Sequence, residues 1–248
     1  MTTFRERLQN NERLVGTMVT LNEPAVAEIL SLVGFDWLFV DAEHGPFEIS
    51  DLGGILQAAG DTPCIVRVAA TNEAAIKRTL DCGAAGIIVP QVNTAEQAAE
   101  VVKYSRYAPE GQRGVGLGRA HGYGLSFQKY VDSANDNVVV VVQAEHIDAV
   151  NNIEAIAKVP GIDAVLLGPY DLSASMGKLG QISDPEVVAA IDQVTAACQA
   201  ANIPLGIFGV SVEALRPYVD QGYSLIVGST DTLFLGGSAS KMLKALRD

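Results

Sequence analysis

The amino-acid sequence predicts a closed (β/α)8 barrel, the TIM barrel, and three observations lead to that fold class. The chain has 248 residues, close to the roughly 250 residues that one such barrel needs. Eight short apolar runs recur along it, each followed by a stretch with helical spacing, which is typical of strands buried on both faces of a parallel sheet. No Gly-x-Gly-x-x-Gly motif follows the first run, which disfavours a dinucleotide-binding open sheet. We therefore expect residues 1–248 to form a single barrel domain.

The elements follow one another in a regular order. The predicted strands are 15–20, 36–41, 63–68, 86–90, 138–143, 163–167, 204–208 and 224–228. Glycines mark the expected ends of five intervening helices, at Gly34, Gly60, Gly83, Gly161 and Gly222. Residues 107–137 interrupt the alternation with a long Gly-rich loop and a short helix, and a loop of this length is typical of a functional or mobile segment.

Composition excludes several classes of protein. Hydrophobic residues make up 48% of the chain and the formal net charge is −12, so we expect a globular protein that binds neither nucleic acid nor an anionic membrane. The three cysteines, Cys64, Cys82 and Cys198, are too widely spaced for a disulfide framework or a zinc cluster and suit a reducing compartment. The polar N-terminal segment and the lack of a long apolar run predict a cytoplasmic protein.

The fifth predicted strand ends in a carboxylate. Five valines precede Gln143, and Glu145 lies two residues further on, so both side chains point to the same side of the strand. A carboxylate at the end of so apolar a strand needs a partner, and a metal or a cation supplies one. A salt bridge at the barrel rim explains Glu145 equally well, because ion-pair networks imitate functional sites.

A second carboxylate, Asp171, follows a Gly-Pro turn after the sixth predicted strand. Helix capping alone would explain an aspartate at this position. Active sites of this fold lie at the carboxyl ends of the strands, however, so Asp171 and Glu145 are expected to be neighbours. Two carboxylates with water and substrate oxygens suit magnesium or manganese, and no cluster of His or Cys favours structural zinc.

Three further observations concern the reaction. His44 lies in a strand-end loop and suits a general base near neutral pH, although a lone histidine is often structural. Arg67 is an isolated cation in an apolar strand, either a clamp for a carboxylate or oxyanion or a buried ion-pair partner of Asp41 or another carboxylate. None of the lysines lies in a predicted strand, so a carbanion would be stabilised by a metal and not by a Schiff base.

Six segments in a constant order make the chain similar to a known family. They are 34–46 (GFDWLFVDAEHGP), 66–68 (VRV), 80–92 (LDCGAAGIIVPQV), 106–116 (RYAPEGQRGVG), 141–145 (VVQAE) and 166–177 (LLGPYDLSASMG). Together they resemble the metal-dependent class II pyruvate aldolases of the HpcH/HpaI family, which includes 4-hydroxy-2-oxoheptanedioate and 2-keto-3-deoxy sugar-acid aldolases.

The resemblance implies a fold, an assembly and a reaction. It implies a barrel whose C-terminal helix is swapped between subunits, in a homo-hexamer built as a trimer of dimers. It implies reversible cleavage of a 4-hydroxy-2-oxo acid to pyruvate and an aldehyde through a metal-stabilised pyruvate enolate. The cofactor would be a divalent metal (Mg²⁺, Mn²⁺ or Co²⁺), with no organic cofactor.

The resemblance also assigns roles to residues. Glu145 and Asp171 would bind the metal, and Arg67 would steady the pyruvate oxyanion. His44 would be the base, made more basic by Asp81. The substrate would contact Gln143, and the backbone of Tyr170 and Asp171 would receive its carboxylate.

Tyr170 and Ala69 depart from the family pattern, Ala69 because family members often have proline there, and the loop 119–124 has its own character. Tyr170 occupies a position associated with a small residue. Arg119, in the long loop, is either a contact for the distal group of the aldehyde or a solvated side chain.

Other functions remain open on the sequence alone. Gly-rich turns at 206–210 and 227–231 would suit a phosphate-binding barrel isomerase, but such an enzyme leaves Glu145, Asp171 and His44 unexplained. A related lyase would use the same metal-enolate site on a different carbon–carbon bond. A non-catalytic binding barrel is the fourth alternative.

Overall fold

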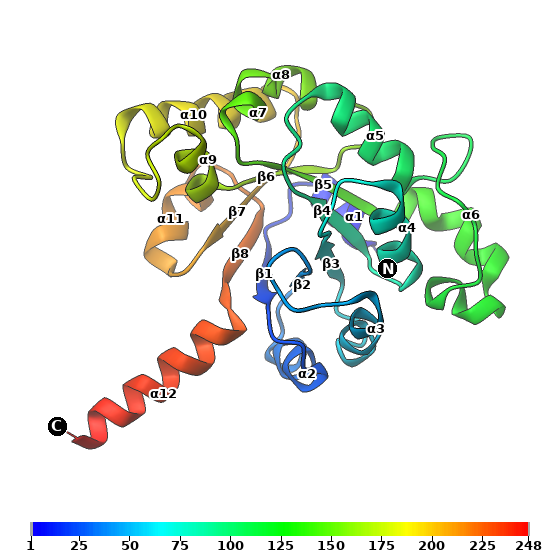
Figure 1. The fold of residues 1–248 in the computed structure, drawn as a ribbon, viewed down its shortest axis with the longest axis horizontal. Coiled ribbons are helices and arrows are strands. Elements are labelled where there is room, and N and C mark those ends of the chain that lie inside the picture. Colours follow the sequence, from blue (N-terminus) through cyan, green and yellow to red (C-terminus); the bar gives the residue numbers. More distant parts are fainter. Residues whose placement is uncertain (1, 248) are drawn as a thin grey trace.

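The structure, a computed structural model, describes residues 2–247 and contains a closed barrel of eight parallel strands (Figure 1). Each strand pairs with its neighbour in sequence, and β1 pairs with β8 to close the barrel, with Leu14 opposite Leu225. The strands are β1 (Leu14–Val19), β2 (Trp37–Asp41), β3 (Cys64–Arg67), β4 (Gly86–Val89), β5 (Val139–Ala144), β6 (Ala164–Leu167), β7 (Leu205–Gly209) and β8 (Leu225–Thr230). Each differs from its predicted range by at most two residues at either end, so the predicted fold class is confirmed.

Helices surround the barrel. They are α1 (Phe4–Gln9), α2 (Pro24–Val33), α3 (Ile49–Ala58), α4 (Glu73–Asp81), α5 (Ala95–Ser105), the 3-10 helix η1 (Arg119–Gly124), α6 (Phe127–Asn137), α7 (Ile147–Asn151), α8 (Ile153–Ile156), α9 (Pro169–Ser175), α10 (Pro185–Ala200), α11 (Val212–Asp220) and α12 (Asp231–Arg247). The predicted exits at Gly34, Gly60, Gly83, Gly161 and Gly222 all have positive φ values. Among the helices described, none has the length and apolarity needed to span a membrane.

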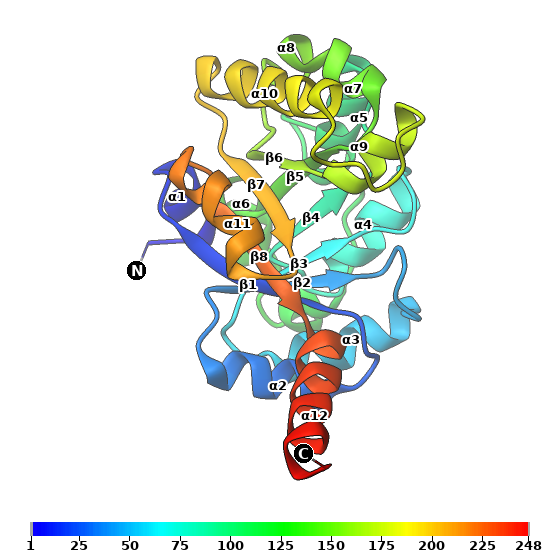
Figure 2. The same cartoon turned by 90° about the vertical axis from the view of Figure 1, so that its left-hand side faces the viewer.

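Helix α12 differs from the other helices because it projects away from the barrel (Figures 1 and 2). Its apolar side chains are exposed, including Leu235 at 67%, Met242 at 64% and Leu246 at 79%. The helix therefore presents an apolar surface that its own barrel leaves uncovered.

The strands divide the core into two layers. In β5, Val139 and Val141 pack in the barrel interior, whereas Val140 and Val142 pack against the surrounding helices. This alternation is the period of an extended strand. It places Gln143 on the interior side, at the carboxyl end of the barrel.

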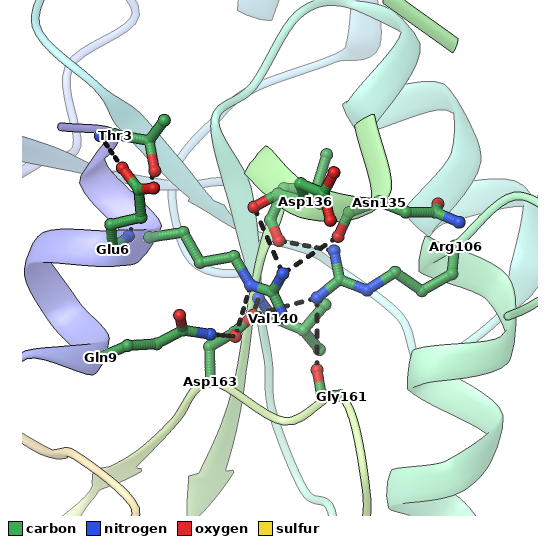
Figure 3. Close-up of polar contacts among 11 residues, drawn as sticks. Thr3, Glu6, Gln9, Arg106, Asn135, Asp136, Val140, Gly161 and Asp163 are labelled. Atoms are coloured by element: carbon green, nitrogen blue, oxygen red, sulfur yellow. Dashed lines mark hydrogen bonds and ion pairs between the residues drawn. The ribbon is translucent and has the colours of Figure 1, made fainter. Parts of the chain in front are cut away.

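The amino-terminal end of the barrel is closed by α1 and a buried ion-pair network around Asp163 (Figure 3). One oxygen of Asp163 lies 2.6 Å from Arg5 Nε, and the other lies 3.1 Å from Arg106 Nη2 and accepts the Val140 N–H at 2.9 Å. Arg106 also donates to the carbonyl of Val138 at 2.6 Å. The charges at this end are therefore paired and hydrogen-bonded, as buried charges require.

All three cysteines are free thiols, as the sequence predicted.

Candidate active site

The candidate active site lies at the carboxyl end of the barrel, where β2, β3 and β5 bring polar side chains to its interior. These side chains are Asp41, Arg67, Gln143 and Glu145, and all four are at most 7% exposed. Phe39, Ile65 and Val141 belong to the interior cluster, and each lies two residues before one of these polar residues. Strand alternation therefore carries the polar residues from an apolar interior to the barrel mouth.

Arg67 and Asp41 form a buried, two-point ion pair. Arg67 Nε lies 2.8 Å from Asp41 Oδ1, and Nη2 lies 2.7 Å from Oδ2. The two residues are opposite each other in the β2–β3 register. Burial opposes the charge of Arg67, but the hydrogen bonds and charge of Asp41, with Glu43 and Glu145, outweigh it and raise the pKa of the guanidinium. The buried ion pair, one of the two interpretations of Arg67 from the sequence, is thus present. Nη1 of Arg67 takes no part in it and can donate to another acceptor.

Asp41 also fixes the loop that follows β2. Its Oδ1 accepts the backbone N–H groups of Glu43 and His44 at 3.2 and 3.3 Å. Glu43 Oε2 in turn lies 3.2 Å from Arg67 Nε. Burial raises the pKa of Glu43, Arg67 and His44 lower it, and the neighbouring charges of Asp41 and Asp171 raise it further.

Asp41 and Glu43 were not predicted from the sequence to have a functional role. The available signal was their spacing of two at a strand end, the same spacing as Gln143 and Glu145.

Glu145 is a buried carboxylate held by two donors. Its Oε1 accepts the backbone N–H of Gln91 at 2.8 Å, and its Oε2 accepts Gln143 Nε2 at 2.5 Å. Burial raises the pKa of Glu145 to about 7, opposed by the Gln91 hydrogen bond and reinforced by the charges of Glu43 and Asp171. A carboxylate with such a pKa gains from a nearby cation.

Gln91 holds its N–H toward Glu145 from a left-handed backbone conformation, with φ of 54°. This conformation is uncommon for a residue other than glycine.

Glu145 and Asp171 are the side chains of the site that could hold a divalent cation, and the charge of Asp171 lies near enough to raise the pKa of Glu145. Asp171 is the third residue of α9, whose N-cap is Gly168 and has no side-chain cap, so Asp171 is not the capping residue. Gln143 Oε1, next to Glu145, is buried without a hydrogen-bond partner. A Cβ at Gly168 would lie 3.2 Å from Glu145 Oε2, so the glycine keeps this side of the carboxylate open.

Within residues 2–247 there is no group of three or more His, Cys, Asp and Glu side chains arranged for a metal. Two protein carboxylates with open positions suit a catalytic cation that also binds water and substrate oxygens.

His44 and Asp81 are not in contact within one subunit. The His44 side chain is 72% exposed, and its Nε2 lies 3.7 Å from Glu43 Oε2. Asp81 ends α4 and binds Arg113 Nη2 at 2.7 Å. The described chain thus brings His44 to the site and holds Asp81 elsewhere.

Tyr170 and Arg119 occupy different ends of the molecule. Tyr170 follows β6, is 60% exposed and packs against Gly180. Arg119 donates to the carbonyls of Cys82 and Leu56 and lines a surface hollow of about 710 Å³ beside the first residue of β3 and the residues just before β4. In this subunit Arg119 is therefore neither at the barrel mouth nor free in solvent.

Comparison with known proteins assigns the family. The model of the HpcH/HpaI aldolase/citrate lyase family matches residues 15–235. The chain belongs to this family. Among its HpcH/HpaI relatives, a 2-dehydro-3,6-dideoxy-6-sulfogluconate aldolase of Pseudomonas putida is 40% identical, with 97% of this chain and 95% of the relative covered. A hydroxypyruvate/pyruvate aldolase of Cupriavidus necator is 37% identical, with 99% and 92% covered.

A solved structure of an HpcH/HpaI family protein from Burkholderia cenocepacia J2315 superposes with a TM-score of 0.96 at 35% identity, and all of both chains is covered. The chain is therefore a carbon–carbon lyase of the aldolase type, as the sequence predicted.

Proposed function

We propose that this enzyme catalyses the reversible aldol cleavage of a 4-hydroxy-2-oxo acid to pyruvate and an aldehyde, with a divalent metal at Glu145 and Asp171. One observation carries the proposal. The carboxylates of Asp41, Glu43 and Glu145 lie around the Arg67 guanidinium at the carboxyl end of the barrel, and the charge of Asp171 acts on Glu43 and Glu145. This excess of negative charge suits a divalent cation with hard oxygen ligands.

Each side chain would have a separate role in the reaction. His44, exposed at the mouth, takes the proton of the C4 hydroxyl. The C3–C4 bond then breaks, C4 leaves as the aldehyde, and the electron pair stays with the pyruvate part as its enolate. Protonation at C3 gives pyruvate. Arg67, held in place by Asp41, directs Nη1 to the developing oxyanion, and Gln143 contacts the substrate.

The metal would supply Lewis acidity at the keto oxygen. Magnesium, manganese and cobalt all suit the donor set, and we propose no organic cofactor. The backbone of Tyr170 and Asp171, at the start of α9, would receive the substrate carboxylate.

A coupled pyruvate-release assay tests the proposal. A panel of 4-hydroxy-2-oxo acids would be offered to the enzyme after chelation and again after each metal is added back. We expect pyruvate release only with metal, and the His44→Ala variant should lose about 10²–10⁴-fold in turnover. Release of no pyruvate from any substrate would exclude the aldolase function, and full activity with a chelator would exclude the metal.

The proposed assembly is a hexamer, a trimer of dimers, in which α12 packs on a partner subunit. The exposed Leu235, Leu243 and Leu246 of α12 support it, because an apolar helix face of this kind marks an interface. Replacing Leu235 and Leu246 with Asp should yield a smaller particle by light scattering, with the circular dichroism of the barrel retained. A hexamer that survives both substitutions would contradict the role of α12.

Asp81 is proposed to act on His44 across such an interface, because Arg113 holds it away from His44 in one subunit. Co-assembled His44→Ala and Asp81→Ala subunits should regain activity, since about a quarter of the sites would receive both native residues. If the mixed oligomer stays as inactive as its parents, Asp81 does not act on His44. We also propose that the protein is cytoplasmic, as expected from the sequence.

A further inference from the structure

The carboxylate of Asp81 is held at one oxygen and open at the other. Asp81 is the last residue of α4, and its side chain is 25% exposed. Arg113 Nη2 donates to Oδ1 at 2.7 Å. Among residues 2–247, no hydrogen bond or ion pair engages Oδ2. Arg113 therefore fixes one oxygen of the carboxylate, and the other can accept a donor from outside the subunit.

The guanidinium of Arg113 is itself held in place by two tyrosines. Its central carbon lies 4.6 Å from the centroid of the Tyr107 ring and 5.6 Å from that of the Tyr130 ring. Nη1 donates to the Tyr130 hydroxyl at 3.2 Å. The side chain of Arg113 is 0% exposed, so the surrounding groups leave it little freedom to move. Asp81 is thus bound by a donor whose own position is fixed.

The loop that follows Arg113 returns to Asp81. Residues 114–117 are exposed, but the next residue, Gly118, packs on Asp81. A Cβ at Gly118 would lie 2.6 Å from the carbonyl oxygen of Asp81 and 3.1 Å from its Cβ, so a larger residue does not fit. The buried His121 accepts the Gly118 N–H at 3.3 Å. Asp81 is therefore held by an ion pair on one side of this loop and by close packing on the other.

The buried guanidinium is a costly way to hold the loop alone. Arg113 Nε is buried without a hydrogen-bond partner, and replacing a buried ion pair by packed apolar groups is often neutral or stabilising. The backbone of the segment has other anchors. Arg113 N–H donates to the Arg106 carbonyl at 2.8 Å, and Tyr107 N–H donates to Asn135 Oδ1 at 2.8 Å. The ion pair with Asp81 therefore indicates a task beyond folding.

We infer that Arg113 is a positioning residue for catalysis, which acts through Asp81 and sets the direction in which Oδ2 meets His44 of the partner subunit. This inference rests on the proposed function, in which Asp81 acts on His44 across an interface. With Oδ1 fixed, Oδ2 accepts one imidazole N–H and leaves the other ring nitrogen free to take the proton of the C4 hydroxyl. Without Arg113 the carboxylate can rotate, and the imidazole loses its fixed orientation.

A double-mutant cycle between Arg113 and Asp81 tests the inference. The metal-loaded, full-length enzyme would be assayed for pyruvate release from the fastest 4-hydroxy-2-oxo acid of the panel, beginning with 4-hydroxy-2-oxopentanoate. Arg113→Met should lower kcat by about tenfold and leave KM within about twofold, because Arg113 does not bind the substrate. In the Asp81→Ala background the same substitution should lower kcat by less than about twofold. Equal losses in both backgrounds would overturn the inference.

Two further variants separate positioning from folding. Arg113→Lys keeps a cation against the tyrosine rings, so it should recover part of the kcat that Arg113→Met loses. It also carries the same cycle should the methionine variant fail to fold. Arg5→Met, at an ion-paired arginine of the opposite end of the barrel, is the matched control and should keep the native kcat. If Arg5→Met lowered kcat as much as Arg113→Met, the loss would reflect stability and not the position of Asp81.

Mixed oligomers assign Arg113 to one side of the interface. Arg113→Met subunits co-assembled with His44→Ala subunits should exceed the mean activity of the two parents. About a quarter of the sites would then combine a native His44 with a native pair of Arg113 and Asp81. Co-assembly of Arg113→Met with Asp81→Ala should give no such gain, because every site would lack one member of the pair. The same result from both mixtures would contradict the inference.

The outcomes separate this inference from the proposed function. An active native enzyme with equal losses in the two backgrounds would refute the role of Arg113 and leave the aldolase intact. A native kcat in Asp81→Ala would refute the role of Asp81, and that of Arg113 with it. Release of no pyruvate from any of the 4-hydroxy-2-oxo acids would refute the aldolase function itself.

Discussion

The two ends of the barrel each hold a buried cluster of arginine and carboxylate side chains, but with opposite charge balance. At the amino-terminal end one carboxylate, Asp163, faces two guanidiniums, Arg5 and Arg106, and backbone carbonyls accept further arginine N–H groups (Figure 3). At the carboxyl end one guanidinium, Arg67, faces several carboxylates, of which Glu145 has a pKa raised to about 7.

The difference indicates separate tasks. Backbone carbonyls accept the remaining arginine N–H groups of the amino-terminal cluster, so its charges and donors are all satisfied. We therefore expect this cluster to stabilise the fold and to take no part in catalysis. At the carboxyl end the surplus is of negative charge, next to the unpartnered Oε1 of Gln143. In the proposed function, a divalent cation offsets this surplus of negative charge. The active ends of barrels of this type are the carboxyl ends, and the other end serves stability.

The largest expected effect is on activity, from Glu145→Gln. The amide keeps the shape of the side chain but loses the charge that would hold the metal, so turnover should fall by about 10²–10³-fold or more. The measurement is metal-dependent kcat/KM together with calorimetric metal binding. Glu154→Gln, at an exposed glutamate of α8, is the matched control and should behave as the native enzyme. If the Glu145→Gln variant bound metal as tightly as the native enzyme, the carboxyl-end cluster would not be a metal site, and the proposed contrast with the structural amino-terminal cluster would be wrong.

The second effect is on stability, from Asp163→Asn at the complete cluster. The substitution leaves Arg106 buried without its counter-charge, which should cost about 3–5 kcal/mol in the free energy of unfolding. Urea denaturation measures the loss, with the exposed Asp220→Asn as control. The kcat of the folded fraction should stay near the native value. A comparable loss of kcat would show that the amino-terminal end also serves catalysis.

The third effect is a pH dependence of the metal-free protein, set by Glu145. Its pKa is raised from 4.5 to about 7 in the folded state, so between these values the folded chain keeps a proton that the unfolded chain has lost. The free energy of unfolding should therefore fall as pH rises from about 4.5 to 7, by up to about 3 kcal/mol.

Thermal melts of chelated protein across this pH range measure the trend. Glu145→Gln should flatten it, and added metal should restore stability at neutral pH. The same slope in the Glu145→Gln variant would assign the titration to another group.

The sequence contained enough to locate the strands and the principal charges. The strands are predictable because their apolar runs are local, and alternation along a strand carries Gln143 and Glu145 to the same side. The rule that the site lies at the carboxyl ends then selects Arg67 and Glu145 from many charged residues.

The roles of other residues depend on contacts that no local pattern encodes. Asp41 holds both Arg67 and the His44 loop because the β2–β3 register sets Asp41 opposite Arg67. The path of residues 107–126 is fixed by packing around the buried His121, which accepts the Gly118 N–H and contacts the Tyr107 hydroxyl. That packing turns Arg119 away from the mouth. It also brings Arg113 to Asp81, where the sequence offered only a loop.

The smallest effect, from Arg5→Gln, shows how complete the amino-terminal cluster is. Arg5 bonds Asp163 at 2.6 Å and the carbonyls of Asn135 and Asp136 at 3.1 and 3.2 Å, but its side chain is 18% exposed, whereas that of Arg106 is 1% exposed. With Arg106 still opposite Asp163, losing Arg5 removes hydrogen bonds without leaving a bare buried charge, so the expected cost is about 1–2 kcal/mol. Arg106→Gln should cost more, because its partners lie deeper and water cannot replace it. Urea denaturation of both variants measures the two losses in the free energy of unfolding. Equal losses would mean that Asp163 needs both arginines. The amino-terminal cluster would then have no surplus of positive charge to contrast with the negative surplus at the active site.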